Sequence, residues 1–422
     1  MNYSLGELKH WNKKIEKLII KKGLDCYPQE FEIIGFEDML CYEAYVGMPS
    51  HYPHWSFGKA YEKLRTLYKY NLTGLPYEMV INSNPSIAYL MKDNTLLLQI
   101  LTMAHVYAHN DFFKNNRLFK EYTNASLAIE MFKNHADRIR AYIQDPSIGY
   151  EEVEKILDAA HSIKYQCGLP INNKSEKGKK EYGSLLEFLI ENGDCKEWEK
   201  DILNIVMKET RYFTPQIETK IMNEGWASWW HYNILKELDL EPSMHIEFLK
   251  VHNQVIRASK GRVNPYYMGF KIWEDIANKS KDPNAIFEIR ALERDSSFIR
   301  RYLNFELCRE MNLMQFDEQD RYYVVTEVAD DDGWRKIRNL LADTVGMGSI
   351  PVITVCDVMK SNNTLHLKHI YDGRELDVTN TFETLKYTAK LWGGKVILET
   401  ILNKHPKRII CSNDLKISLE NI

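Results

Sequence analysis

Apolar residues recur at intervals of three and four along most of residues 1–315, which is the spacing that one face of an α-helix requires. Several of these segments also begin with residues that favour a helix start. Asn94 and Asn124 are predicted N-caps, and Thr214 followed by Pro215 predicts a helix start, because proline at the first helical position loses no hydrogen bond. The pattern predicts helices at residues 5–22, 56–70, 94–114, 124–144, 150–164, 196–210, 215–238, 244–257 and 265–279.

The pattern changes near residue 321, where short runs of β-branched and aromatic residues alternate with turn residues, as is typical of strands. Two helical segments, at 331–345 and 381–391, lie among these runs. We therefore predict a mainly helical domain over residues 1–315 and a small α+β domain over 316–422. The predicted strands are "RYYVVTEVA" (321–329), "IPVITVCDV" (350–358), "TLHLKHIY" (364–371) and "GKVILETIL" (394–402).

Length and charge exclude some classes of protein. The 422 residues are enough for two or three domains, and a formal charge of -4 gives no general attraction to nucleic acid. No apolar run approaches the roughly 20 residues that cross a bilayer, and the charged N-terminus does not have the pattern of an export signal. We therefore expect a soluble cytoplasmic protein that neither enters a membrane nor binds nucleic acid.

Two further features fit this picture. The seven cysteines are odd in number and widely spaced, which is typical of reduced thiols rather than of a disulfide framework or a CxxC metal site. The polar, glycine-rich and lysine-rich stretch at 167–184 predicts an exposed, mobile loop between two helical halves.

The first candidate site lies in "ILTMAHVYAHNDFFKNN", residues 100–116. Residues four apart on a helix share one side, so His105 and His109 can reach one metal ion, at about 2.0 to 2.1 Å from each. The apolar residues on the same face turn both imidazoles toward the interior. The alternative is that the two residues are core histidines that happen to share a face.

A second segment, "IETKIMNEGWASWWHYNIL" at 217–235, places Glu224 and His231 on one helix face among apolar residues. A buried carboxylate without a partner costs several kcal/mol, whereas a metal ion satisfies it directly. The alternative is a surface glutamate beside a tryptophan. Two histidines from one helix and a glutamate from a later helix form the gluzincin type of zinc site, so we predict His105, His109 and Glu224 as ligands of a divalent ion, with zinc as the expected metal.

One residue of the HExxH metallopeptidase motif is absent. The glutamate that follows the first histidine of that motif accepts a proton from water, and Val106 occupies this position here. Either another group takes that role, or the site binds metal without peptidase chemistry. The candidates for the role are Glu43, Glu78, His231 and His252.

Other polar residues are candidates for binding a substrate. The aromatic loop at 42–59 carries His51 and His54, and packing over the helices is the alternative to a lid or substrate-binding role. The stretch 74–90 predicts a short strand running into an asparagine-rich turn, with a plain structural edge as its alternative. Tyr266 could hydrogen-bond an oxyanion, or it could simply pack. The predicted substrate-binding residues are His51, His54, Asn82, Asn110 and Asn264, the last of which is also a predicted helix cap.

Five blocks of the sequence together resemble the stage V sporulation protein R family, and they run in family order from about residue 40 to 280. They are "YVGMPSHYPHWSFGK", "GLPYEMVINSNP", "AHVYAHNDFFKNN", "KIMNEGWASWWHY" and "NPYYMGFKIWEDI". The family's His-x-x-x-His-Asn block falls on His105, His109 and Asn110, and its Asn-Glu-Gly-Trp-Ala block on residues 223–227. The latter block is also similar to the segment that supplies the third zinc ligand in a group of bacterial metallopeptidases.

The resemblance implies a cytosolic bacterial protein linked, in spore formers, to the peptidoglycan cortex of the spore. Relatives in other bacteria are often encoded beside a serine protein kinase, which makes such a kinase a candidate functional partner. We expect a multi-helix, zincin-like metalloprotein in which His231, His252 and Tyr266 face the metal as catalytic residues. Its reaction would be hydrolysis of an amide bond in a peptide or cell-wall precursor. The alternative is a non-catalytic cytosolic regulatory or assembly protein for cortex formation.

Overall fold

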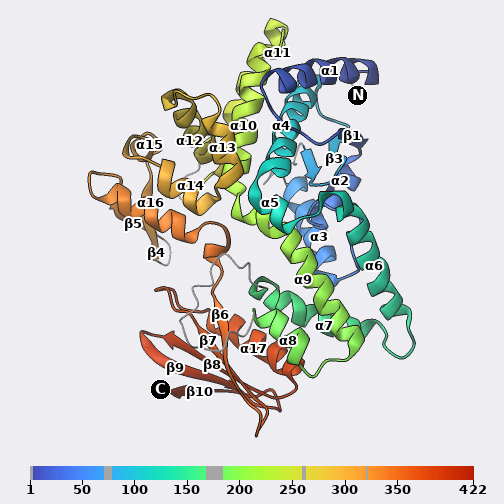
Figure 1. Cartoon of the computed structure of the whole chain (residues 1–422), viewed down its shortest axis with the longest axis vertical. Helices are drawn as coiled ribbons and strands as arrows, with labels where there is room; N and C mark the ends of the chain where they lie inside the picture. The colour runs from blue at the N-terminus through green and yellow to red at the C-terminus, as the bar shows by residue number, and fades with distance from the viewer. Residues whose placement is uncertain (1–2, 71–77, 168–183, 259–262, 320–321) are drawn as a thin grey trace. The chain divides into compact units, whose positions relative to one another are not determined.

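The computed structural model describes residues 3–70, 78–167, 184–258, 263–319 and 322–422 (Figure 1). The loop predicted at 167–184 lies almost entirely outside these residues. The described chain is mainly helical and ends in a sheet region, as the sequence predicts. None of its described helices is both long enough and apolar enough to cross a membrane.

The chain forms two compact units, neither of which is a single stretch of sequence. Unit 1 comprises Met1–His51, Trp55–Lys133 and Pro215–Ser349, and unit 2 comprises Tyr52–His54, Asn134–Thr214 and Ile350–Ile422. The division by packing therefore differs from the sequence division at residue 316, which stays a prediction about domains.

Unit 1 contains most of the helices. They are α1 (Leu5–Lys21), α2 (Phe36–Ala44), α3 (Trp55–Lys69), α4 (Leu96–Asn115), α5 (Arg117–Tyr122), η1 (Ala125–Leu127), α10 (Lys220–Glu237), α11 (Pro242–Val255), α12 (Pro265–Lys279), α13 (Ala285–Leu292), α14 (Asp295–Tyr302), α15 (Phe305–Glu310), α16 (Gly333–Thr344) and η4 (Gly346–Ser349). Its strands are β1 (Gln29–Ile34), β2 (Glu78–Ile81), β3 (Ser86–Met91), β4 (Met314–Gln319) and β5 (Tyr322–Val328).

The core of unit 1 is built on α4 and α10, which pack against each other (Figure 1). Every side chain of α4 from Gln99 to Phe113 is buried, so this helix is enclosed on all sides. Helix α10 also packs against α12, and these two helices cross at Gly225 and Gly269. A Cβ atom on Gly225 would lie 2.2 Å from the carbonyl carbon of Gly269, so only glycine permits this close approach of the two backbones.

A three-stranded sheet in the order β1-β3-β2 also belongs to unit 1. Strand β1 runs parallel to β3, and β2 runs antiparallel to β3 at the edge of the sheet. The sequence predicted only a short strand within 74–90. It missed β1, which pairs with residues more than fifty positions away, as Gln29 does with Ser86.

The predicted helix start at Pro215 is wrong. Pro215 lies inside α9 (Glu197–Glu218), which tolerates the loss of one backbone hydrogen bond there, and α10 begins only after Thr219. The backbone N–H groups of Ile221 and Met222 donate to the carboxylate of Asp295 at 2.8 and 2.9 Å. A remote side chain therefore caps α10, and no local pattern could show this.

The other predicted caps have different outcomes. Thr95, not Asn94, caps α4, since its hydroxyl accepts a hydrogen bond from the N–H of Leu98. Asn124 precedes the short helix η1 and makes no side-chain cap bond. Asn264 is confirmed as the cap of α12, because its side-chain oxygen accepts from the N–H of Tyr266.

Unit 2 is built around a five-stranded sheet in the order β10-β9-β8-β7-β6. Strands β7 and β8 are parallel and are joined through α17, which packs against the sheet and against α7, and the other pairs are antiparallel. Three of these strands and α17 were predicted, whereas β9 and β10 were missed. The elements are α7 (Tyr150–Ile163), η2 (Lys164–Gln166), α8 (Leu185–Asn192), β6 (Ile353–Met359), β7 (Thr364–His369), α17 (Val378–Trp392), β8 (Lys395–Leu402), β9 (His405–Cys411) and β10 (Ile417–Asn421), while α6 (Ala128–Gln144) and α9 each include residues of both units.

Candidate metal centre

Four acidic and imidazole side chains meet inside unit 1, and we call them the histidine–glutamate cluster: Glu78, His105, His109 and Glu224. The two histidines project from α4, with ring centroids 4.6 Å apart. Glu78, the first residue of β2, places Oε1 3.1 Å from Nε2 of His105. Glu224 of α10 places Oε2 3.5 Å from Nε2 of His109 and 4.0 Å from Nε2 of His105. The structure thus brings the three predicted metal ligands together and adds Glu78.

These separations suit a small cation. Ligand atoms about 2.0 to 2.1 Å from a tetrahedral ion stand about 3.3 to 3.4 Å from one another. The three measured separations, from 3.1 to 4.0 Å, lie around that value. Potential ligand atoms of Glu78, His105 and His109 all lie within 4.8 Å of one another, so this group could hold a metal ion.

Burial makes the two carboxylates need a partner. The Oε2 atoms of Glu78 and Glu224 are both buried, and neither has a hydrogen-bond partner. A buried carboxylate oxygen without a partner is unfavourable by several kcal/mol, and a cation removes that cost. Oxygen and imidazole nitrogen donors together are a usual ligand set for zinc and related divalent ions. The residues present therefore fit a metal ion, although they do not identify which one.

The orientation of His109 is set by a neighbour on α10. Nδ1 of His109 lies 2.8 Å from Oδ1 of Asn223. An amide oxygen only accepts hydrogen bonds, so Nδ1 carries the hydrogen and donates it. The lone pair then lies on Nε2, the nitrogen that faces Glu224. Such an outer hydrogen bond fixes the tautomer of a metal-binding histidine.

Burial also sets the protonation of the cluster. It lowers the pKa of His105 to about 4, although the charge of Glu224 and a hydrogen bond with the backbone of Ala227 act in the opposite direction. Burial, followed by the influence of His105, lowers the pKa of His109 as well. Burial raises the pKa of Glu78 to about 8, against an opposing effect of His109. Both imidazoles are thus neutral at neutral pH, which is the form that binds metals.

The three predicted catalytic residues take two different positions. Tyr266 stacks against His105, with ring centroids 6.3 Å apart and planes 24° from parallel. His231 and His252 instead extend from the Nδ1 side of His105, opposite to the nitrogen that faces the glutamates. A catalytic role for each of the three stays a prediction.

The two loop histidines are held by other parts of the chain. His51 is buried among aromatic rings, with centroids 4.3 Å from Phe57 and 5.9 Å from Phe132. Nε2 of His54 lies 3.1 Å from Oδ1 of Asp158 in α7. Packing therefore accounts for both side chains, and their role in substrate binding stays a prediction.

The three asparagines predicted to bind substrate also have internal partners. Asn82 donates to the hydroxyl of Thr123 at 2.9 Å. Asn110 accepts from the N–H of Tyr27 at 2.7 Å and donates to its carbonyl oxygen at 3.0 Å, which attaches the segment before β1 to α4. Asn264 caps α12. Each has a structural function on these contacts, and substrate binding by any of them stays a prediction.

Among the candidates for the missing base, only Glu78 faces the Nε2 side of His105. Glu43 accepts a hydrogen bond from the hydroxyl of Tyr68 at 2.8 Å, within the packing of α2 and α3. The sequence named Glu78 as a candidate base but gave no reason to prefer it, and it missed the orienting role of Asn223. The signal in the sequence for this role was the position of Asn223, a polar residue directly before Glu224 on a buried helix.

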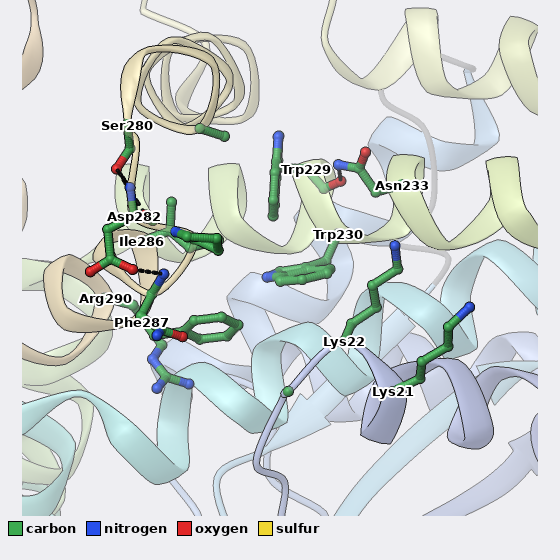
Figure 2. A pocket seen from close by; sticks show the side chains of 14 residues that line it. Lys21, Lys22, Trp229, Trp230, Asn233, Ser280, Asp282, Ile286, Phe287 and Arg290 are labelled. Atoms are coloured by element: carbon green, nitrogen blue, oxygen red, sulfur yellow. Dashed lines mark hydrogen bonds between the residues drawn. The ribbon is translucent and has the colours of Figure 1, made fainter.

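A separate cavity of about 660 Å³ lies on the other side of α10, with Trp229, Trp230 and Asn233 in its wall (Figure 2). No residue of the histidine–glutamate cluster lines it. Each helical residue turns about 100°, so Asn233 points about half a turn away from His231. Helix α10 thus presents polar chemistry on one face and an aromatic wall on the other, and Glu224 lies on the first.

Comparison with known proteins gives two results. Residues 2–183 and 171–350 match the family model described as "SpoVR like protein", and residues 351–403 match "SpoVR-like C-terminal domain". The chain is 33% identical over 464 aligned residues to the uncharacterized protein YcgB of Escherichia coli (strain K12), an alignment that covers 92% of this chain and 90% of that protein. No solved structure matches the chain.

Proposed function

The chain belongs to the SpoVR-like protein family, and from this premise we propose that the histidine–glutamate cluster is the centre of a metal-dependent hydrolase that cleaves an amide bond. The observation that carries the proposal is the convergence of two neutral imidazoles with two carboxylates whose Oε2 atoms are buried and have no hydrogen-bond partner. Burying these groups without a cation is unfavourable, so a purely structural purpose explains them poorly.

In this proposal His105, His109 and Glu224 hold the ion, and Glu78, which also lies within ligand distance of both histidines, acts on the substrate instead. A divalent ion, when bound, polarises a carbonyl oxygen and makes water a better nucleophile at neutral pH. Three protein ligands leave a position open for this chemistry, whereas four ligands would close it. We assign zinc as the expected metal because the donors are nitrogen and oxygen and the spacing suits a tetrahedral site.

Glu78 takes the role of general base, because Val106 occupies the position of the glutamate in the HExxH motif and cannot accept a proton. Its Oε1 lies 3.1 Å from Nε2 of His105, on the side where the ion would bind. A bound cation would oppose the burial that raises the pKa of Glu78, so that the ionised carboxylate could accept a proton from an attacking water. The tyrosine beside His105, Tyr266, can donate a hydrogen bond to the oxygen on which negative charge develops. These assignments give the zincin-like chemistry a base from a strand rather than from the metal-binding helix.

An extended peptide is the substrate class that the surroundings favour. Strand β2 begins at Glu78 and lies at an edge of its sheet, with β3 as its ladder partner among the described strands. An edge strand can align an extended peptide through backbone hydrogen bonds and carry its amide group to a nearby site. A peptide or a cell-wall precursor would present such an amide.

Membership of the family suggests a function related to sporulation. We propose that the hydrolase acts in the cytoplasm during formation of the spore cortex, with a serine protein kinase as a functional partner. Val106 supports one competing function, in which the protein assembles or regulates cortex enzymes without catalysis. Complementation separates the two functions, because a non-catalytic protein would still restore the cortex of a null strain after Glu78→Gln.

Metal analysis of the purified protein tests the centre itself. We expect about one equivalent of divalent metal, lost in Glu224→Gln and retained in Glu78→Gln. If Glu78→Gln loses the ion and Glu224→Gln keeps it, the roles of the two glutamates are exchanged. Wild-type protein that binds no divalent metal under any loading condition would end the proposal.

A further inference from the structure

Three buried imidazoles form a continuous hydrogen-bonded row behind the cluster, and we call it the histidine chain: His105, His231 and His252. Nδ1 of His105 lies 2.8 Å from Nδ1 of His231, and Nε2 of His231 lies 2.8 Å from Nδ1 of His252. His105 and His231 are fully buried, and His252 is 3% exposed. The chain joins α4 to α10 and α10 to α11, and both nitrogens of His231 are engaged in it.

A row of neutral imidazoles can be hydrogen-bonded in only two directions. Each neutral ring carries one N–H and one lone pair, so each must donate to one neighbour and accept from the other. In the outward direction His105 donates from Nδ1 to His231, and His231 donates from Nε2 to His252. The inward direction reverses both bonds and puts the hydrogen of His105 on Nε2.

Only the outward direction permits His105 to bind a metal ion through Nε2. It leaves the lone pair of His105 on Nε2, which faces the glutamates at 3.1 and 4.0 Å. The inward direction places an N–H there, and this group would donate to Glu78 instead. A protonated His231 is equally unsuitable, since it would donate from both nitrogens and require a lone pair on Nδ1 of His105.

We infer that His231 and His252 are positioning residues of the metal centre, which hold His105 in the tautomer that presents its Nε2 lone pair to the ion. This inference rests on the proposed metal centre. Asn223 performs the same task for His109 with a single amide oxygen, whereas His105 has two histidines in series, together with its hydrogen bond to the backbone of Ala227. His231 accepts from His105, and His252 keeps His231 in the accepting orientation by taking its remaining hydrogen.

Aromatic side chains pack against His252, the last residue of the histidine chain. Tyr232 stacks on His252, with ring centroids 4.6 Å apart, and Phe270 contacts the same imidazole at 5.1 Å. Apolar walls of this kind keep the last histidine in place without offering it a charge. The rings of His231 and His252 are both almost fully enclosed, and burial favours the uncharged form of an imidazole, so neutral rings fit the geometry.

Zinc affinity in four variants of the full-length protein tests the inference. Loss of an outer hydrogen bond to a metal-binding histidine weakens metal affinity by about 10- to 100-fold, which is the loss we expect for His231→Phe. His231→Gln keeps an oxygen that can accept from Nδ1 of His105, so it should recover most of that loss. His252→Phe removes only the second link and should fall between wild type and His231→Phe.

His369→Phe is the matched control, because His369 is also buried and hydrogen-bonded, through Nδ1 to Thr400 at 3.0 Å, but lies in the C-terminal sheet. Its zinc affinity should equal that of wild type. A merely structural histidine chain would give the same loss with Gln as with Phe at position 231, and that result would overturn the inference.

Nitrogen-15 NMR of histidine-labelled, zinc-loaded wild-type protein gives a test that needs no variant to fold. The inference requires hydrogen on Nδ1 of His105, on Nε2 of His231 and on Nε2 of His252. Hydrogen on Nδ1 of His231 would overturn it. The two proposals fail separately: wild type that binds no zinc removes the metal centre, whereas zinc binding that is indifferent to His231→Phe removes only the positioning role.

Discussion

Among the residues that the structure describes, two regions bury histidines beside carboxylates, and one of them, the histidine–glutamate cluster, fits a metal ion. Unit 2 contains a paired cluster in which each histidine has a dedicated partner. Nδ1 of His135 lies 3.0 Å from Oε1 of Glu209, and Nε2 of His54 lies 3.1 Å from Asp158. The third pair joins the hydroxyl of Tyr52 and Nε2 of His161 at 2.8 Å.

The difference lies in what the carboxylates lack. None of the side-chain atoms in the paired cluster is among the buried polar atoms without a hydrogen bond in the described part of the chain, whereas Oε2 of Glu78 and of Glu224 both are. When each buried hydrogen-bond donor has an acceptor, the hydrogen bonds stabilise the packing and no polar atom is left for a ligand to bind. Unmet acceptors, rather than buried histidines as such, therefore distinguish the candidate site.

The largest effect should come from removing the imidazoles of the site. We expect the double variant His105→Ala, His109→Ala to fall from about one equivalent of bound zinc to background, because two of three ligands are gone. His135→Ala, which breaks a pair in the other cluster, should keep its zinc. Metal content by mass spectrometry after dialysis measures both, and full retention in the double variant would contradict the comparison.

The next effect concerns hydrolysis. We expect Glu78→Gln to bind zinc normally and to lower kcat by about 10² to 10⁴, because an amide cannot accept the proton from water. Mass spectrometry of cell-wall peptides incubated with the zinc-loaded protein would measure the rate. A Glu78→Gln protein with wild-type turnover would show that another group is the base.

The same substitution should have opposite effects on stability in the two regions when metal is removed. Glu78→Gln replaces a buried group with an unmet oxygen, so the metal-free protein should be as stable as wild type or more stable. Glu209→Gln weakens the pair with His135 and should cost about 1 to 3 kcal/mol. Urea unfolding in the presence of a chelator measures both, and equal losses would remove the distinction between the clusters.

The smallest effect is a pH dependence of the metal-free protein. Burial raises the pKa of Glu78 to about 8, above its ordinary value of 4.5, and burial does the same for Asp295. The folded protein then holds protons that the unfolded chain has released, so stability falls as pH rises toward 8, by at most about 1.4 kcal/mol per pH unit for each proton.

The lowered pKa of His105, about 4, acts in the opposite direction at lower pH, because the unfolded chain binds a proton there that the folded chain does not. The loss of stability should therefore be clearest between about pH 6.5 and 8, above the ordinary pKa of histidine. Glu78→Gln should reduce the slope in that interval, as measured by unfolding at a series of pH values. An unchanged slope would assign it to Asp295 alone.

Several features could be predicted from the sequence because neighbouring residues encode them. The spacing of apolar residues located α4, and helical geometry then placed His105 and His109 on one side of it. Asn264 and Pro265 specified the start of α12 through a local cap. The chemistry of Glu224 among apolar residues indicated a carboxylate in need of a partner. Local patterns thus determined most helices and three of the four cluster residues.

Only the tertiary structure decided which distant groups meet. The edge strand brings Glu78 to His105, and α10 brings His231 to the same residue across 126 positions of sequence. Asp295 caps α10 from a later helix, which explains why the local prediction at Pro215 was wrong. Helix periodicity and caps depend on residues within one or two turns, whereas these contacts depend on how whole elements pack. Local sequence patterns therefore identified the types of ligand, and tertiary packing assembled these ligands into one site.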